Sequence, residues 1–189
     1  MEKKRLDIMT DIETLGRGID CTVFQIAAMA FDVTTGEILR TFDMVADISK
    51  ETPIVDGATI KWWLDTNKEL LHKLLNAGIC SESELIKAFY DWIVSFGDEY
   101  EVHLWGNGIL FDNNIIRSHM QKIGLVYPIG YNKDRDMRTI VELASMKSSL
   151  SEKELRKKFH IEGTTVHDAF DDVRNQISVV HNCYKIIMN

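Results

Sequence analysis

The N-terminal part of the chain reads Leu6-Asp7-Ile8-Met9-Thr10-Asp11-Ile12-Glu13-Thr14-Leu15-Gly16. Its first five residues are mostly apolar and a glycine closes the stretch, which is typical of a short strand that ends in a turn. Alternate side chains of a strand point to the same face, so the carboxylates of Asp11 and Glu13 can converge on one hard cation. Two solvated acids in a turn explain the same letters, because Asp-x-Glu is a common pattern. This stretch alone leaves the role of the acids open.

Two further strands follow close behind. The segment from Cys21 to Asp32 is rich in apolar residues, and it ends at the turn Thr34-Thr35-Gly36-Glu37. A third strand is expected from Ile38 to Val45. Because a short glycine-bearing turn joins neighbouring strands into a hairpin, we expect the first three strands to form an antiparallel meander.

From Asp56 onward the hydrophobic period becomes helical. A first helix is expected up to Gly78, and Ser81-Glu82-Ser83-Glu84 offers a capping box for a second helix through about Phe96. The remaining elements expected are a strand from Val102 to Trp105, a helix from Phe111 to Ile123, a segment near Arg135–Thr139 that leads into a helix through about Met146, and a final helix from about His167 to Ile187. Strands followed by mixed helices and strands predict an α/β fold.

Composition limits the class of protein. The 189 residues are 45% hydrophobic and 27% charged, which predicts one soluble globular domain over residues 1–189. Three scattered cysteines favour neither a disulfide scaffold nor a zinc site. No stretch is long enough to span a bilayer, and no leader peptide is apparent, so we expect a cytoplasmic protein without a membrane partner. The net charge of −7 argues against an extended grip on many phosphates.

Two later segments also carry acids at ordered places. Asp112 follows a predicted strand and loop at the start of a helix, where the macrodipole alone can explain an acid. His167-Asp168-Ala169-Phe170-Asp171-Asp172 places a histidine five residues before an acid, and a capped, solvated helix start explains that pattern too. The joint occurrence of all three segments in this order is what favours a common site.

These three segments resemble the Exo I, Exo II and Exo III motifs of the DEDDh 3′–5′ exonucleases, which belong to the ribonuclease H-like superfamily. The closer likeness is to the branch of phage exonuclease A and the RNase AS-type exonucleases, and it runs from about Asp7 to Val173. The further matches to that branch are Thr59-Ile60-Lys61-Trp62-Trp63, Gly106-Asn107, Phe111-Asp112 and Arg135-Asp136-Met137-Arg138-Thr139.

The resemblance implies a ribonuclease H-like exonuclease fold, with a mixed central sheet that contains the antiparallel three-stranded meander and is flanked by helices. It also implies a metal site of two Mg²⁺ or Mn²⁺ ions, with His167 as the general base. The implied ligands are Asp11, Glu13, Asp112 and Asp172. The family spacing His-x-Ala-x-x-Asp favours Asp172 over Asp171. Asp168 and Asp171 are expected beside the ligands or in solvent, and whether either shares the metal site stays open.

Matching positions also suggest contacts to the substrate, from Trp62, Trp63, Asn107, Phe111 and Arg138. Tryptophans at helical positions are more often core residues, so one of Trp62 and Trp63 is expected in the core while the other can stack on a base. A guanidinium at position 138 can hold a phosphate, or it can form a structural salt bridge with Asp136. Both interpretations of each residue stay open.

The function implied is a 3′–5′ exonuclease that hydrolyses phosphodiester bonds from the free 3′ end of single-stranded nucleic acid. DNA is slightly favoured by the likeness to phage exonuclease A, and an exoribonuclease of RNase AS type is the alternative. An inactive nucleic-acid-binding protein of the same fold is the third reading, and a phosphotransferase is disfavoured because no GxxxxGK[ST] loop is present. Thr66-Asn67 replaces a Gln-Ser pair that is frequent in relatives. The resemblance leaves open a homodimer, and a phage or prophage origin with action in the host cytoplasm.

Overall fold

A five-stranded mixed sheet forms the centre of the protein in a computed structural model, which describes residues 3–189. The strand order is β3-β2-β1-β4-β5. The strands are β1 (Lys4–Thr14), β2 (Val23–Phe31), β3 (Ile38–Val45), β4 (Tyr100–Gly106) and β5 (Asp134–Asp136). The first three are antiparallel, while β4 runs parallel to β1 and β5 runs parallel to β4. The predicted meander and mixed sheet are confirmed.

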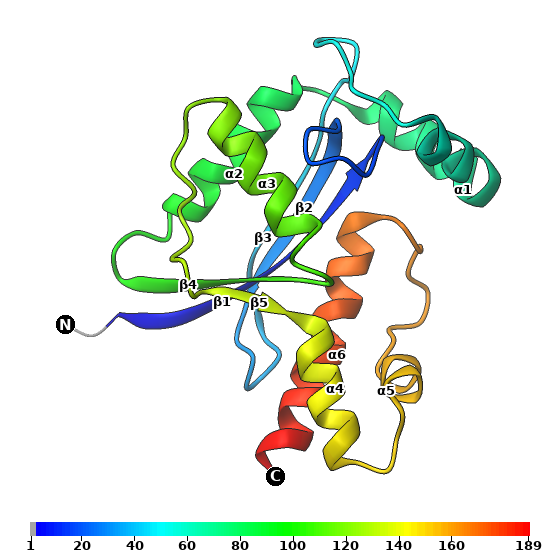
Figure 1. Cartoon of the computed structure of the whole chain (residues 1–189). Helices are drawn as coiled ribbons and strands as arrows, with labels where there is room; N and C mark the ends of the chain where they lie inside the picture. Colours follow the sequence, from blue (N-terminus) through cyan, green and yellow to red (C-terminus); the bar gives the residue numbers. More distant parts are fainter. Residues whose placement is uncertain (1–2) are drawn as a thin grey trace.

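Helices cover both faces of this sheet (Figure 1). They are α1 (Gly57–Ala77), α2 (Glu82–Val94), α3 (Asp112–Lys122), α4 (Met137–Lys147), α5 (Glu152–Lys158) and α6 (Ala169–Met188). Helices α2 and α3 pack on one face, and α6, flanked by α4, packs on the other. The sequence analysis did not predict the short elements β5 and α5. It placed the other helices within a few residues, and the capping box of Ser81 and Glu84 is present.

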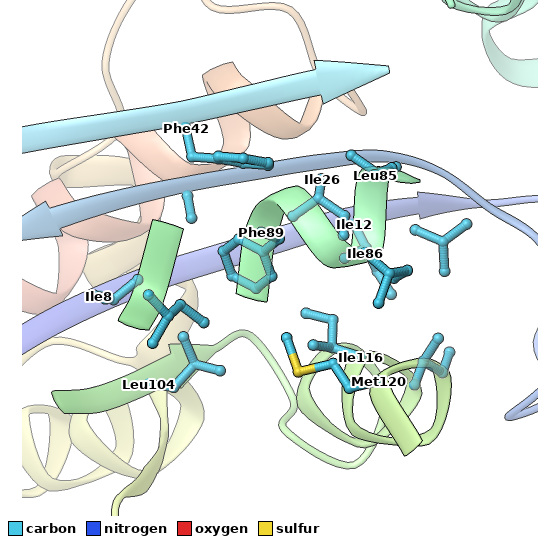
Figure 2. Packing of buried hydrophobic residues seen from close by; sticks show 14 of the residues in the cluster. Ile8, Ile12, Ile26, Phe42, Leu85, Ile86, Phe89, Leu104, Ile116 and Met120 are labelled. Carbon is cyan, nitrogen blue, oxygen red and sulfur yellow. The ribbon is translucent and has the colours of Figure 1, made fainter. Parts of the chain in front are cut away.

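The larger core lies between the sheet and α2 and α3, as Figure 2 shows. Ile8 and Ile12 of β1 face Phe89 of α2 and Ile116 of α3 within this buried cluster. Because strand side chains alternate, the odd-numbered residues of β1 point the opposite way. Met9 accordingly belongs to the second core, which α4 and α6 cover. The same alternation sends Asp11 and Glu13 to the face that α6 covers.

Helix α1 departs from the expected regular helix. Asn67 has φ −154° and ψ 62°, which interrupts the helix in its middle. The interruption leaves backbone amides of α1 without their helical partners. Asn67 Oδ1 accepts a hydrogen bond from the Leu70 amide at 3.3 Å, and so caps the second half of α1. Asn67 therefore starts a new helical segment within α1, which hydrophobic periodicity could not reveal.

The predicted domain of residues 1–189 includes Met1 and Glu2, which lie outside the described residues. Among residues 3–189, no helix is long and apolar enough to cross a membrane.

Candidate active site

Asp11 and Glu13 lie near the end of β1, side by side on the face toward α6. Glu13 is buried, and Asp11 is half-buried. Asp172 comes from the first turn of α6. One carboxylate oxygen from each of Asp11, Glu13 and Asp172 lies within 4.8 Å of the other two. Three acids from two elements 159 or more residues apart in sequence thus form a group that can hold a metal ion.

At the start of α6, Asp172 has different contacts from the neighbouring acids Asp168 and Asp171. Asp168 is the N-cap of the helix and accepts a hydrogen bond from the Phe170 amide. Asp171 accepts one from the Thr165 amide at 2.8 Å and pairs with Arg174 at 3.3 Å. These contacts engage Asp168 and Asp171 outside the group, and Asp172 is the acid of the three that faces Asp11 and Glu13.

Asp112 lines the same cavity, of about 460 Å³, as the other three acids. It is buried at the first position of α3, directly after the loop that leaves β4. Gly106 makes this placement possible, because a Cβ there would lie 2.8 Å from Asn113 Oδ1 and 3.4 Å from an Asp112 carboxylate oxygen. A side chain at position 106 would collide with the Asn113 amide, next to Asp112 at the start of α3.

Burial and mutual repulsion disturb the ionisation of these acids. Desolvation raises the pKa of Asp11 and of Glu13 well above their ordinary values, and the charges of the neighbouring acids raise both further. Desolvation also raises the pKa of Asp112, to about 7, although backbone amides and Arg138 act against it. The pKa of Asp172 is raised by burial as well. Crowded buried carboxylates of this kind are stable as anions only when cations compensate them.

Gln176 is bonded to this acid group, and the sequence analysis missed it. Its Nε2 donates a hydrogen bond to Asp11 Oδ1 at 2.7 Å, which lowers the pKa of Asp11 and fixes the orientation of the carboxylate. The amide oxygen Oε1 of Gln176 is buried, without a hydrogen-bond partner among the described residues, and the residue lines the cavity of the acids. Gln176 lies one helical turn after Asp172, so the spacing i, i+4 was the signal that pointed to it.

His167 lies at the mouth of this group, just before α6 rather than within it. Its φ of 67° is the left-handed region, and its backbone amide donates to Asp172 Oδ2 at 3.1 Å. The ring packs edge-on against Trp62, with centroids 4.7 Å apart. The Asn67 side chain donates to the Val166 carbonyl at 3.3 Å. The kink of α1 therefore helps to hold the loop that presents the imidazole.

An apolar cavity of about 510 Å³ adjoins the acids, and Ile12, Glu13 and Phe111 line both cavities. Trp63 is 1% exposed and donates its indole N–H to the Thr14 carbonyl at 3.1 Å, whereas Trp62 is 41% exposed. Both tryptophans line the apolar cavity. Trp63 is thus a core residue that borders the cavity, and Trp62 keeps part of its ring exposed there.

Basic and amide groups also line the acid cavity. The guanidinium of Arg138 lies against Gly108. A Cβ on residue 108 would come within 2.7 Å of Arg138 Nη2, and the φ of Gly108 is +118°, so a glycine is required there. The backbone amide of Arg138, rather than its guanidinium, bonds to Asp136. Among residues 3–189 no carboxylate lies within 4.0 Å of the Arg138 guanidinium, so the salt bridge considered for this residue is not formed.

Arg156 and His160 also line this cavity, and the sequence analysis assigned neither of them. Arg156 Nη1 donates to Asn107 Oδ1 at 3.4 Å. Both residues depend on α5, whose capping box of Ser151 and Glu154 was the overlooked signal. The geometry therefore brings together all five predicted catalytic residues and the five predicted substrate contacts, in two adjoining cavities.

Comparison with known proteins agrees with this geometry. A sequence profile of the family described as the 3′–5′ exoribonuclease Rv2179c-like domain matches residues 6–184. The chain belongs to this family. It is a 3′–5′ exonuclease, a hydrolase of phosphodiester bonds, and the resemblance found in its motifs is confirmed. Preference for DNA or RNA does not follow from the match.

One curated relative of this exonuclease is the exodeoxyribonuclease of Enterobacteria phage T4. The two are 23% identical over 207 residues, which cover 96% of this chain and 90% of the relative. The relative's name concerns deoxyribonucleic acid, while the family description concerns ribonucleic acid.

Solved structures share the fold. The zinc-bound form of an E. coli ExoI–ssDNA complex matches with a TM-score of 0.67 at 16% identity, over 93% of this chain. The chain spans 39% of the length of that ExoI chain. The nuclease domain of 3′hExo, a DEDDh family member bound to rAMP, matches with a TM-score of 0.64 at 14% identity over 95% of this chain and 92% of that one. The predicted ribonuclease H-like exonuclease fold is confirmed.

Proposed function

We propose that this exonuclease shortens single-stranded nucleic acid from the free 3′ end, with Asp11, Glu13, Asp112 and Asp172 holding two Mg²⁺ or Mn²⁺ ions. The observation that carries the proposal is the convergence of acids from β1, α3 and α6 on one cavity. The oxygens of Asp11, Glu13 and Asp172 lie within the 4.8 Å expected of ligands to a common ion.

The donor set fits hard divalent cations. All four proposed ligands are carboxylates, which Mg²⁺ and Mn²⁺ prefer, and no thiol takes part. Burial raises the pKa of Asp11 and Glu13 strongly, so this group as anions requires compensating positive charge. When bound, a pair of such ions would supply Lewis acidity and align the attacking and leaving oxygens for in-line displacement at phosphorus.

His167 accepts the proton of the attacking water in this proposal. Its ring lies at the lip of the acid cavity, and an imidazole can take up a proton near neutral pH. The backbone bond to Asp172 and the packing against Trp62 restrict the position of the ring. A base held in this way loses little entropy when the water arrives.

The terminal nucleoside occupies the apolar cavity beside the acids. Trp62 offers the exposed part of its ring to the base, and Phe111 separates this cavity from that of the acids. The guanidinium of Arg138, which forms no salt bridge within residues 3–189, lines the cavity with Asp112 and contacts the phosphate at the cleavage site. Asn107, in the loop between β4 and α3, shapes the cavity around the terminal nucleotide.

DNA is the first candidate substrate, because the phage T4 relative, which aligns with nearly the whole chain, is named an exodeoxyribonuclease. RNA is the second candidate, because the matching family is described as an exoribonuclease. A place of action in the cytoplasm, of a phage-infected or lysogenic cell, and assembly as a homodimer accompany this proposal as predictions, as does a single catalytic domain over residues 1–189.

The test uses matched 5′-labelled single strands of DNA and RNA with Mg²⁺ or Mn²⁺. We expect ladders that shorten from the 3′ end, with the DNA strand degraded faster, and no shortening with a chelator. A block at the 3′ end should stop the reaction, while a block at the 5′ end should not. Folded protein that shortens neither strand with either ion would contradict the proposal.

A further inference from the structure

The cavity that contains the acids is also lined by cationic side chains that the proposed reaction does not use. Arg156 of α5 and His160 of the following loop line the same cavity as the carboxylates. Helix α5 lies beside α4 and α6, as Figure 1 shows. Two divalent ions would only balance the four carboxylates, and the chain carries a net charge of −7. Cationic donors in the same cavity therefore have a clear electrostatic use for a polyanionic strand that must enter it.

Arg156 is half-buried and its guanidinium is mostly unpaired. Its Nη1 donates to Asn107 Oδ1 at 3.4 Å and contacts Met137 Sδ at 3.9 Å. Within residues 3–189 no carboxylate lies within 4.0 Å of it, in contrast to Arg5, which pairs with Asp7, or Arg117, which pairs with Asp134. A guanidinium has five donors in a fixed fork that matches phosphate. Most of those donors remain free for a ligand.

The loop that follows α5 is fastened to α6 by several hydrogen bonds. Asn175 Oδ1 accepts from the Ile161 amide at 2.9 Å, and Asn175 Nδ2 donates to Thr164 Oγ1 at 2.8 Å. Ser178 donates to the Phe159 carbonyl at 2.7 Å. These contacts hold the segment between Arg156 and His160 in place before any ligand binds. Donors that are fixed in advance bind a phosphate at a lower entropic cost.

We infer that Arg156, with His160 beside it, binds the phosphate next upstream of the scissile one, which is the second phosphodiester from the 3′ end. This inference rests on the proposed function. The terminal nucleoside occupies the apolar cavity and the scissile phosphate lies at the acids. The next phosphate therefore meets the cationic donors that line the acid cavity but not the apolar one, which include Arg156 and His160. Arg138 stays with the scissile phosphate, because its guanidinium lies against Gly108 in the loop that leads to Asp112, and both residues line the acid cavity.

The competing explanation is that Arg156 only braces the Asn107 loop. A brace supports the site for every substrate, so its loss slows cleavage of all substrates by the same factor. If Arg156 contacts the phosphate, replacing Arg156 and neutralising the phosphate remove the same contact, so the second change adds little to the effect of the first. The two explanations therefore differ in whether the variant still senses the charge of that phosphate.

The experiment measures single-turnover cleavage of two matched single strands, one native and one with a neutral methylphosphonate at the second linkage from the 3′ end. The unmodified protein should cleave the modified strand about tenfold more slowly, as expected for one charge-assisted hydrogen bond. Arg156→Gln should cleave the native strand about tenfold more slowly and show little further loss on the modified strand. The matched control Lys157→Gln removes an exposed charge from the same helix, and it should retain the full discrimination.

His160→Gln should reduce the discrimination by a smaller factor, because an exposed imidazole contributes less than a forked guanidinium. An Arg156→Gln protein that discriminates as well as the unmodified one overturns the inference, and so does an active unmodified protein that cleaves both strands equally. In those two cases the exonuclease proposal stands. Absence of 3′ shortening on any strand contradicts the exonuclease proposal itself, and the inference falls with it.

Discussion

Replacing Gln176 with methionine should weaken the metal site without disturbing the fold. The two side chains are similar in length and volume, so the change removes one hydrogen-bond donor and leaves little space. The lost contact is the 2.7 Å hydrogen bond from Gln176 Nε2 to Asp11 Oδ1. A hydrogen bond to a charged group contributes about 2 kcal/mol, which corresponds to about 30-fold in metal affinity. Losses of that size are typical when the partner of a metal ligand is removed.

The assay is the rise in melting temperature with Mn²⁺, in the absence of nucleic acid. At a concentration 100 times the dissociation constant of the unmodified protein, one bound ion stabilises the fold by about 2.7 kcal/mol, and a site 30-fold weaker by about 0.9 kcal/mol. The melting temperature of Gln176→Met without metal reports any structural damage separately. The reasoning about the Gln176 contact is refuted if the variant needs no more Mn²⁺ than the unmodified protein for the same rise.

Three further predictions concern Asp172, Trp62 and Asp112. Asp172→Asn should abolish turnover and the Mn²⁺-dependent rise in melting temperature, whereas Asp171→Asn, whose position contacts Thr165 and Arg174, should keep both. Trp62→Ala should weaken binding of a single strand about tenfold, measured as Kd by titration in Ca²⁺, because one stacked base is lost; unchanged affinity would contradict a role for this ring. Burial raises the pKa of Asp112 to about 7, so without metal the folded protein holds a proton there that the unfolded chain releases above about pH 4. The contribution of Asp112 to stability in chelator should therefore fall as the pH rises from 5 to 7. Asp112→Asn should remove this contribution and leave the slope that Asp11 and Glu13 produce, because their pKa values are raised as well.

Local patterns predicted most of the sheet and the helices. The turn from Thr34 to Glu37 fixed the pairing of β2 with β3, and the capping box of Ser81 fixed the start of α2. The same kind of box at Ser151 was overlooked because α5 has only seven residues. Strand β5 has three residues, too few for an alternating pattern. Asn67 breaks α1 through its own side-chain contacts, which a hydrophobic period does not record.

Some residues of the site could likewise be predicted from the sequence, and others could not. The acids of β1 were predictable from strand alternation, and Asp112 and Asp172 only through the order of the motifs. The choice between Trp62 and Trp63 needed the burial of each ring, which depends on tertiary packing. The i, i+4 spacing from Asp172 indicates only on which side of α6 Gln176 lies, because its partner Asp11 is 165 residues away in sequence. Arg156 was missed because its partner Asn107 is 49 residues away. Contacts of that range are set by the folded structure and leave little trace in spacing.

A crystal structure of the protein grown with Mn²⁺, with diffraction recorded on either side of the manganese absorption edge, would locate the bound ions. We expect two anomalous peaks in the cavity among the carboxylates of Asp11, Glu13, Asp112 and Asp172, and loss of both in Asp172→Asn. Peaks bound elsewhere on the molecule, or four carboxylates that remain without manganese at saturating concentration, would contradict the account.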